Sequence, residues 1–479
     1  MSPHFPSKNM RHFLLLFGLL VLTNHVCAQA QERPNIILML SDDQGWSGTS
    51  VAMHPTIDAS KGSIFHTPNL ERMAMLGMRF SNAYSPAPVC SPTRISLQTG
   101  KSPAQLHWTK AAPAETGQML IEPRLIKSIP ENEITIGELL QKAGYATAHY
   151  GKWHISGGGP AKHGYDEHDG DTGNEQAFKF VDPNPVDIFG MAQRAEDFMQ
   201  ANSQKGKPFF IQLSWNALHA SENANRATLA KYQTKLSGQN EKRISTAAIT
   251  EDLDTGVGLV LDAVERLGLS KNTYVIYMSD NGAGGGGGGG AGGNPQDADN
   301  RSNAKRGLRG GKGGVWEGGI RVPFIITWPS HLKPAVYPEP VVQTDVHATA
   351  LAAAAISTDP NWKLEGTNLL PHLTSQQATP PHAALFWRFG QQMAVRSGPW
   401  KLVRYDTTAD GLAAGISTPK LYNLSDDQSE SKDLAAAHPE KVRELQSLWD
   451  HWNKDNAKPL WGSDHPAPGG KGQKRRRNP

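Results

Sequence analysis

The sequence predicts an α/β protein with a large, mixed but mostly parallel sheet between helices, followed by a smaller antiparallel sheet. Two apolar runs, 36–40 and 274–278, are typical of parallel strands that are buried on both faces. Strand and helix patterns alternate up to about residue 375, whereas short strand candidates follow one another beyond it. The 479-residue chain is long enough to bury a sizeable core.

Residues 1–30 have the features of a secretory signal peptide. Basic residues precede an apolar run over 13–22, and Ala28-Gln29-Ala30 offers a small-residue cleavage site. The apolar run is too short for an ordinary membrane anchor. We therefore expect an exported protein, periplasmic or extracellular in a bacterium, with no stable membrane span. Export would leave Cys90 as the only thiol, which is either a small buried hydrophobe or a group with a chemical role.

Residues 92–99 are predicted to form a short helix. Pro92 suits the first turn of this helix, and Gly100 follows its last turn. Cys90 then lies where the helix begins, beside free backbone N–H groups and the positive end of the helix dipole. Arg94 adds a positive charge about one turn further along. Position 90 is therefore suited to an anion, or to a nucleophile that develops negative charge.

Acidic and amide side chains follow both apolar runs. Asp42 and Asp43 come after the first run, and Asp280 and Asn281 come after the second. Sites in open α/β sheets form beyond the carboxyl ends of the strands, so the two pairs are expected to meet in one crevice. Three carboxylates and an amide oxygen suit Ca²⁺ or Mg²⁺ rather than a thiophilic metal. Either pair alone could equally be a turn that ends a strand.

Between the two apolar runs, further elements place basic and imidazole side chains near the same edge of the sheet. Residues 134–143 predict a helix that leads into a strand, and Lys152 and His154 alternate across the end of this strand, so that both can point to one face. Residues 209–215 predict another strand, and His219 falls just beyond it. Lone basic or imidazole side chains of this kind are often only solvated.

Lys312 lies in a glycine-rich stretch where the backbone can approach a ligand closely. The alternative for this residue is a flexible, solvated lysine.

The strand candidates beyond residue 375 are 384–387, 392–396 and 401–405, joined by turns. An amphipathic helix over about 439–452 follows them, and its inward residues are expected to be Val442, Leu445, Leu448 and Trp449. We therefore expect a catalytic domain over 31–375, a subdomain over 376–460 and a disordered basic tail over 461–479.

Charge argues against a nucleic-acid partner. The formal net charge is +3, but the signal peptide contributes +2 and the tail contributes five positive charges, which leaves −4 on the body. A domain that binds nucleic acid would be expected to carry a basic face.

Several short segments, in family order over about residues 33–450, resemble the type I sulfatases of the alkaline phosphatase superfamily. The signature is Cys90-x-Pro92-x-Arg94 followed by Thr99-Gly100. The other matching segments are Asn35 to Gly45, Thr67-Pro68-Asn69-Leu70, Gly151-Lys152-Trp153-His154, Ser279-Asp280-Asn281-Gly282, Leu308 to Lys312 and Glu317 to Pro323.

The resemblance implies an alkaline-phosphatase-like fold and a specific chemistry at position 90. In that family a maturation enzyme oxidises the cysteine to formylglycine (3-oxoalanine), whose hydrate has two hydroxyls on one carbon. By the resemblance, Asp42, Asp43, Asp280, Asn281 and position 90 bind Ca²⁺. One hydroxyl attacks sulfur and the alcohol leaves; the second then expels sulfate and restores the aldehyde.

The resemblance also assigns the basic residues. Arg94, Lys152 and Lys312 would hold the sulfate oxygens and the formylglycine, and His154 would deprotonate the second hydroxyl. His219 would protonate the leaving oxygen with help from Lys312. The family usually has prolines around this histidine, whereas this chain reads Ala217-Leu218-His219-Ala220.

The function that follows is hydrolysis of a sulfate ester, on a sulfated carbohydrate or an aryl sulfate. One alternative is a phosphoesterase or phosphonate hydrolase of the same superfamily, because the tetrahedral anions are similar. Others are an inactive glycan-binding relative, and a hydrolase that uses unmodified Cys90 and would need a nearby base. The sequence does not identify the sugar or the position of its sulfate.

Overall fold

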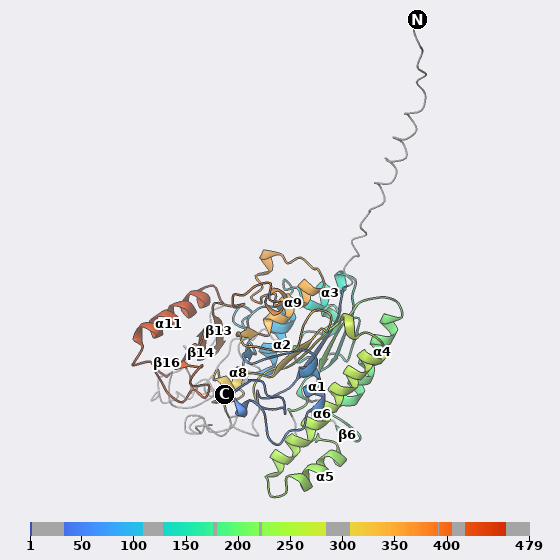
Figure 1. Cartoon of the computed structure of the whole chain (residues 1–479), viewed down its shortest axis with the longest axis horizontal. Helices are drawn as coiled ribbons and strands as arrows, with labels where there is room; N and C mark the ends of the chain where they lie inside the picture. The colour runs from blue at the N-terminus through green and yellow to red at the C-terminus, as the bar shows by residue number, and fades with distance from the viewer. Residues whose placement is uncertain are drawn as a thin grey trace, which may run out of the picture. The chain divides into compact units, whose positions relative to one another are not determined.

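The computed structural model describes Met1 and residues 33–108, 128–175, 180–219, 223–283, 307–390, 392–404 and 417–456 (Figure 1). The predicted signal peptide and basic tail lie outside the described residues, apart from Met1. Of the residues described, no helix combines the length and apolar character needed to cross a bilayer.

An eight-stranded sheet forms the centre of the described fold. Its strands are β1 (Asn35–Ser41), β2 (Met78–Phe80), β4 (Ala146–Gly151), β5 (Glu167–His168), β8 (Phe209–Ser214), β9 (Thr273–Ser279), β10 (Phe324–Thr327) and β11 (Ala335–Tyr337). The spatial order is β11-β2-β10-β9-β1-β8-β4-β5. Only β10 runs antiparallel to both of its neighbours, so the sheet is mixed and mostly parallel, as predicted.

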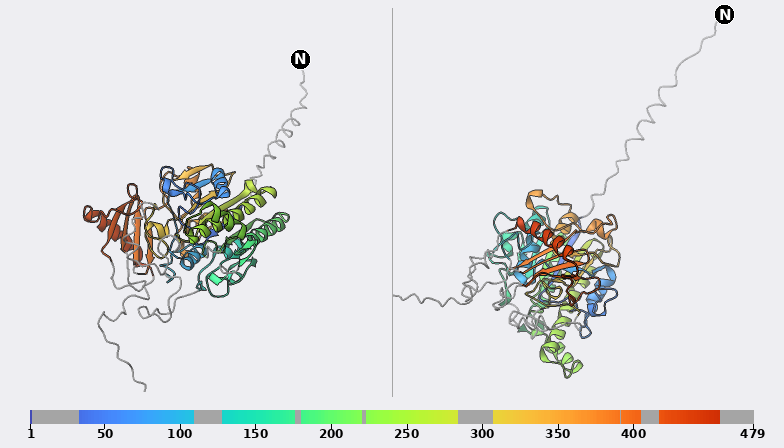
Figure 2. Two further views of the ribbon diagram at one scale, coloured as in Figure 1. Left: turned by 90° about the horizontal axis from the view of Figure 1, so that it is seen from below. Right: turned by 90° about the vertical axis from the view of Figure 1, so that its left-hand side faces the viewer.

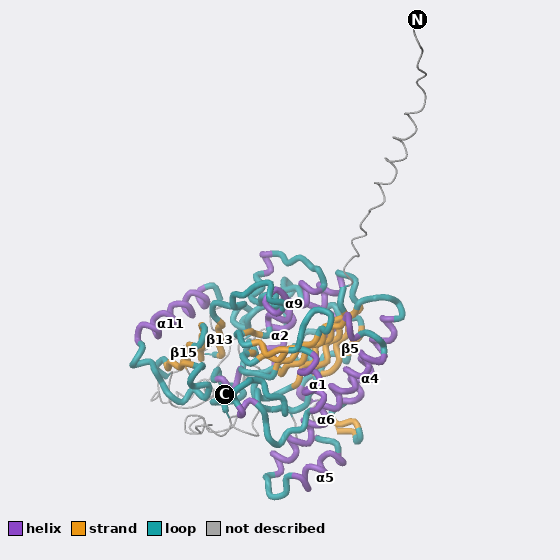
Figure 3. Tube along the Cα trace, viewed as in Figure 1, coloured by secondary structure: helices purple, strands orange, loops and turns teal. Residues whose placement is uncertain are grey.

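Helices cover both faces of this sheet (Figures 1 and 3). The α-helices are α1 (Pro68–Leu76), α2 (Cys90–Thr99), α3 (Ile136–Lys142), α4 (Ile188–Ser203), α5 (Arg226–Lys235), α6 (Glu241–Arg266), α8 (Glu317–Ile320), α9 (Thr344–Ala353), α10 (Leu370–Leu373) and α11 (Pro439–Lys454). Single turns of 3-10 helix occur at Asp58–Ser60, Pro160–His163, Ser270–Asn272 and Pro360–Trp362. Two-stranded pairs are formed by β3 (Ala83–Tyr84) with β12 (Val341–Val342), and by β6 (Phe180–Val181) with β7 (Asn184–Pro185).

The burial of β1 explains why its sequence has no polar alternation. Ile37 and Met39 belong to the core on the face covered by α1, α4 and α6. Ile36, Leu38 and Leu40 belong to the core on the face covered by α2, α3 and α9. Because successive side chains point to opposite faces, a strand between two helix layers must be apolar throughout. The prediction of a strand buried on both faces is confirmed.

Local signals also set the two helices that were predicted near the site. α2 begins at Cys90, two residues before the predicted start, and Gly100 ends it in the left-handed region at φ 69°. α3 begins with a capping box, in which the side chain of Thr135 and the side chain of Glu138 each accept from the other's backbone N–H. α1 lacks such a cap, and Asp254 of α6 accepts from the backbone N–H groups of Asn69 and Leu70 at 2.9 and 2.8 Å instead.

A four-stranded antiparallel sheet follows, in the order β13 (Leu385–Phe389), β14 (Gln392–Ser397), β15 (Trp400–Arg404) and β16 (Lys420–Asn423). Figure 2 shows these strands together with α11. The first three strands match the predicted segments within two residues at each end. β16 was not predicted, because four residues that include a lysine and an asparagine carry little strand signal.

One inward residue of α11 was predicted wrongly. Leu445 is fully buried, and Val442 and Trp449 pack beside it, whereas Leu448 is 38% exposed. Leu448 lies at the edge of the apolar stripe formed by the other three residues. The neighbouring Trp452 packs on the sheet instead, with its ring centroid 5.1 Å from that of Phe386. The domain boundary near 375 stays a prediction, because the described residues from Pro34 onward form one unit.

Candidate active site

The ends of β1 and β9 bring the two predicted ligand pairs together. These strands are parallel neighbours, with Ser41 paired to Ser279, so the residues that follow them leave the sheet side by side. Beyond the strands, Asp280 donates its backbone N–H to Ser41 O at 3.0 Å, and Asp43 donates its own to Asp280 Oδ1 at 3.1 Å. Asp43 has a φ of 60°, which turns the chain sharply at this point.

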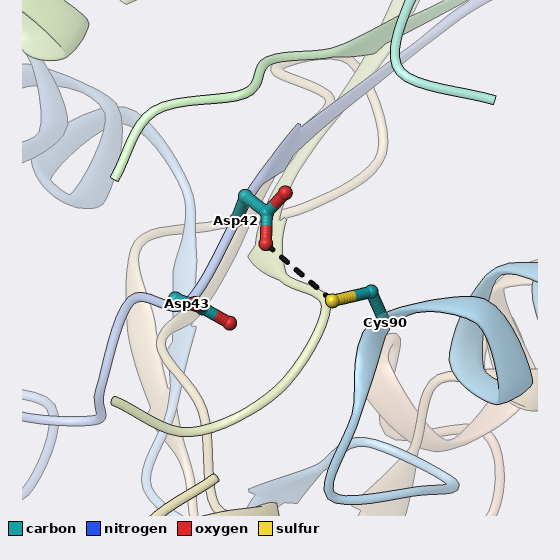
Figure 4. Close-up of side chains that lie close together, drawn as sticks. All are labelled: Asp42, Asp43 and Cys90. Carbon is teal, nitrogen blue, oxygen red and sulfur yellow. Dashed lines mark hydrogen bonds between the residues drawn. The ribbon is translucent and has the colours of Figure 1, made fainter. Parts of the chain in front are cut away.

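The beginning of α2 places Cys90 against Asp42. The thiol Sγ lies 3.8 Å from Asp42 Oδ1 and is buried (Figure 4). Asp42, Asp43 and Cys90 each offer a donor atom, and these three atoms lie within 4.8 Å of one another. Burial raises the pKa of the Cys90 thiol to about 12. An unmodified thiol here would stay protonated at neutral pH and would be a poor nucleophile.

Asn281 completes the oxygen-rich cluster. Its side-chain Nδ2 donates to Asp43 Oδ1 at 2.8 Å and to Gly282 O at 2.9 Å. Its Oδ1 is buried and has no hydrogen-bond partner among the described residues. A buried acceptor without a partner is costly unless a cation or a water satisfies it. The carboxyl groups of Asp42 and Asp43, with Asp280 and the unpartnered amide oxygen of Asn281 beside them, therefore make this edge rich in oxygen atoms.

Three basic side chains balance the carboxylates. Arg94 lies one turn along α2 from Cys90, and its guanidinium donates to Asp280 Oδ2 at 2.8 Å and to Lys152 O at 2.6 Å. The ammonium group of Lys152 contacts Asp42 and is fully buried. Lys312 Nζ lies 2.7 Å from Asp43 Oδ1. The structure thus brings together all three basic residues that the sequence proposed.

Asp42 and Asp280 have opposite pKa shifts. Burial alone would favour a neutral Asp42, but the charges of Lys152 and Arg94 outweigh it and hold the pKa of Asp42 well below its usual range. Burial and the charge of Asp42 raise the pKa of Asp280 to about 6. The negative charge of Asp42 therefore opposes ionisation of Asp280, as in other pairs of neighbouring carboxyl groups.

Lys152 and His154 do not lie on a strand, contrary to the alternation predicted for them. β4 ends at Gly151, and His154 has a φ of 55°, a left-handed conformation that ends the extended chain. The backbone N–H of His154 donates to Thr172 O at 2.7 Å, which fixes this turn. Burial, with the charges of Lys152 and Arg94, lowers the pKa of His154 to about 3. The imidazole thus lies in the field of the cluster and is neutral at neutral pH.

His219 reaches the cluster through an extension of the sheet. Asp42 donates its N–H to Ala217 O at 2.8 Å, and Leu218 donates its own to Asp42 O at 2.7 Å, so the chain beyond β8 follows the end of β1. Burial lowers the pKa of His219, while Asp42 opposes this shift. The Nδ1 atoms of His154 and His219 are buried without a hydrogen-bond partner among the residues described.

Sequence reasoning missed the residues that hold the Lys312 segment from the other side. Gln392 of β14 accepts from Val315 N at 3.3 Å and donates to Gly313 O at 3.2 Å. Arg309 donates to Tyr422 Oη at 3.1 Å and to Glu430 O at 3.0 Å. The segment Leu308 to Lys312 matched a family pattern, but its partners lie about 80 to 120 residues away and carry no local signal.

Relatives of known activity resemble most of this chain. N-acetylgalactosamine-6-sulfatase of Mus musculus is 31% identical over 408 residues, which cover 78% of this chain and 73% of the relative. Arylsulfatase A of Homo sapiens is 28% identical over 477 residues, which cover 87% of each chain.

A solved structure and a family comparison agree with these relatives. The crystal structure of Ps i-CgsB superposes with a TM-score of 0.73 at 24% identity and covers 89% of this chain and 94% of that chain, which shows a shared fold. The sulfatase family model matches residues 34–356, which span the main sheet from β1 to α9 and the whole cluster described above. The chain therefore belongs to the sulfatase family, whose members are sulfuric ester hydrolases.

Proposed function

We propose that this protein is an exported, formylglycine-dependent sulfatase that uses Ca²⁺ to remove a sulfate group from a carbohydrate. The observation that carries the proposal is the meeting of Cys90, the carboxylates of Asp42 and Asp43, and three basic side chains at one edge of the sheet. Sulfate transfer needs positive charge around the anion and a nucleophile beside it. The cluster has this arrangement.

The donor set fits a hard divalent cation. Asp42, Asp43 and Asp280 offer carboxylate oxygens, Asn281 offers its unpartnered Oδ1, and the residue at position 90 lies against them. A Ca²⁺ ion prefers such oxygen ligands, and it would neutralise the charge that raises the pKa of Asp280. When bound, the ion would supply Lewis-acid activation and charge stabilisation at the sulfate group. Mg²⁺ has the same ligand preference but tolerates fewer ligands.

Position 90 is suited to a modified side chain. The geminal hydroxyls of a hydrated formylglycine would supply one oxygen to attack sulfur and a second to release sulfate. The place where α2 begins supports this role, because backbone N–H groups and the helix dipole stabilise negative charge there. The unmodified thiol, with its raised pKa, is a poor alternative.

The basic side chains hold the anion from several sides. Arg94 and Lys152 are buried beside Asp280 and Asp42, so their positions are fixed before substrate binds. Lys312 is the least buried of the three, with a side chain 17% exposed, and this exposure supports its proposed contact with an incoming sulfate oxygen. Fixed cations in a site that excludes water stabilise charge without reorganising.

The two histidines divide the proton transfers. His154 is neutral, the state that a base needs to take a proton from the residue at position 90. His219 gives a proton to the leaving alcohol oxygen, and the negative charge of a bound sulfate group favours the protonated ring that an acid needs. Both rings have a buried, unpartnered Nδ1 and lie in the field of the cluster.

A sulfated carbohydrate is the proposed substrate class. One relative named above acts, by its name, on a 6-sulfate of N-acetylgalactosamine. The proposal of an exported protein rests on the signal-peptide pattern of residues 1–30 and suits an extracellular or periplasmic polysaccharide. A maturation enzyme in the host would be the protein's partner before folding.

The mass of the tryptic peptide over residues 80–94 tests the modification. Protein from the native host is expected to show an aldehyde in place of the thiol at Cys90, and release of inorganic sulfate from sulfated sugars is expected in the same preparation. Protein made in a host without the maturation enzyme is the control and should keep an alkylatable thiol. A plain cysteine in fully active native protein would overturn the proposal.

Substituting His219 is expected to discriminate between leaving groups. The His219→Ala variant should lose about 10²- to 10⁴-fold in kcat/KM on a sugar sulfate, because a poor alkoxide leaving group needs a proton. On 4-nitrophenyl sulfate the loss should be at least tenfold smaller, since nitrophenolate leaves without a proton. Steady-state kinetics with both substrates measures this ratio. Equal losses on the two substrates would assign His219 to binding rather than to proton transfer.

A further inference from the structure

The segment that carries Lys312 is held tightly against the active site on one side. Lys312 donates its backbone N–H to Ala283 O at 3.1 Å, just beyond the ligand Asn281. Gly313 donates to Pro88 O at 2.9 Å, just before Cys90. The backbone of Lys312 is therefore fixed to both loops that form the cluster.

The same segment folds back on itself without side chains between its two parts. The N–H of Gly318 donates to Arg309 O at 2.6 Å. A Cβ atom on Gly319 would lie 2.0 Å from Gly314 O, and one on Gly318 would lie 2.5 Å from Arg309 O. The start of α8 thus touches the turn that carries Lys312, backbone on backbone. A displacement of α8 would be transmitted directly to this turn, because packed backbone is stiff.

The C-terminal sheet holds the start of α8 through a buried ionic cluster. Lys401 Nζ of β15 lies 2.9 Å from Glu317 Oε1 and 2.9 Å from Glu430 Oε1. Glu317 donates its backbone N–H to Glu430 Oε2 at 2.7 Å, and its Oε2 accepts from the hydroxyl of Tyr84 at 2.8 Å. All four side chains are fully buried. Figure 1 shows α8 beside the C-terminal strands.

Three cationic side chains meet two carboxyl groups in this cluster. Arg321 Nη1 lies 3.4 Å from Glu317 Oε2, and Arg396 of β14 donates to the hydroxyl of Tyr84. Although burial by itself favours a neutral carboxyl, the charge of Lys401 and of the two arginines lowers the pKa of Glu317 to about 2. Buried ion pairs of this kind give little net stability, yet losing one partner is costly, so their value lies in fixing a geometry.

We propose that Lys401 and Glu430 are positioning residues, which hold α8 so that the Lys312 ammonium stands at the sulfate-binding edge of the cluster. This inference rests on the proposed function, in which Lys312 binds a sulfate oxygen. The C-terminal sheet then belongs to the catalytic apparatus. Gln392 supports the same segment independently, through its two hydrogen bonds to the backbone of Val315 and Gly313.

A double-mutant cycle between Lys401 and Lys312 tests the proposal. The full, matured protein is assayed with 4-nitrophenyl sulfate, and inorganic sulfate is used as a competitive inhibitor. Lys401→Met is expected to lower kcat/KM by about 10- to 100-fold and to weaken sulfate inhibition about tenfold, because a displaced cation binds the anion poorly. In the Lys312→Ala background the same substitution should change both quantities less than about threefold.

A purely structural role would not give this pattern. Losses from Lys401→Met that are equal in both backgrounds would overturn the proposal, as would a Lys401→Met variant with unchanged sulfate inhibition. Lys401→Arg is expected to restore most of the sulfate binding. The matched control is Lys420→Met on the neighbouring strand, where the partly exposed lysine lies 3.8 Å from Asp433 Oδ2. This variant should show no coupling to Lys312.

A replacement variant and an activity control separate the possible reasons for a negative result. If Lys401→Met does not fold, Glu430→Gln replaces it in the same cycle, since it removes the charged partner of Lys401 and keeps the shape of the side chain. If wild-type protein releases no sulfate from 4-nitrophenyl sulfate or from sulfated sugars, the proposed function fails. If wild type is active, Lys312→Ala is impaired and the cycle shows no coupling, only the positioning role fails.

Discussion

Replacing Cys90 by serine is expected to stop turnover, with a loss of about 10⁴-fold or more in kcat. A serine side chain has one oxygen, so once that oxygen has attacked sulfur, no second hydroxyl on the same carbon can release the sulfate. Protein incubated with substrate should therefore accumulate with the mass of one added sulfo group. Intact-mass measurement and peptide mapping of residues 80–94 locate this group.

The matched variant for this experiment is Cys90→Ala. It should be equally inactive but should gain no mass, because it has no nucleophilic oxygen. Sustained turnover by the serine variant would show that release does not need a second hydroxyl at position 90. A sulfo group on another residue would show that this other residue is the nucleophile.

Removing divalent cations with a chelator is expected to lower kcat/KM by about 10³-fold, and Ca²⁺ should restore it. Without a cation, Asp42, Asp43 and Asp280 crowd negative charge where the sulfate must approach, and Asn281 Oδ1 has no partner among the described residues. Saturating Ca²⁺, at about 100 times its Kd, should also stabilise the folded state by about 2.7 kcal/mol. A thermal unfolding curve with and without Ca²⁺ measures this effect independently of activity.

The Asn281→Leu variant sharpens this test, because it removes the free amide oxygen and leaves the three carboxylates in place. This variant should need a higher Ca²⁺ concentration than wild type for the same increase in the unfolding temperature. Asp262→Asn is the matched control, since that carboxylate pairs with Arg72 at 2.7 Å on the surface, away from the cluster. Activity and unfolding that are both insensitive to the chelator would exclude a required metal.

The elements that carry the site could be predicted because their causes are local. A short apolar run with no polar alternation and many β-branched residues is typical of a strand covered on both faces, and β1 and β9 are buried in this way. Pro92 lies in the first turn of α2 and Gly100 ends the helix, both for reasons of backbone geometry. The failure at His154 has a cause further along the chain. The alternation across Trp153 predicted a strand end, but the left-handed φ of His154 is imposed by contacts with Thr172.

By itself, the sequence determined which residues stand at the ends of the strands and at the start of α2, because strand and helix signals act over a few neighbouring residues. Only the tertiary structure decided which strands are neighbours, and so brought Asp42 against Asp280 and Cys90. It also brought Lys401 of β15, and Glu430 from the loop after β16, against Glu317 at the start of α8. Such contacts join residues far apart in the chain, 48 positions for Asp42 and Cys90 and 84 for Glu317 and Lys401. They depend on packing, which has no periodic signal in the sequence.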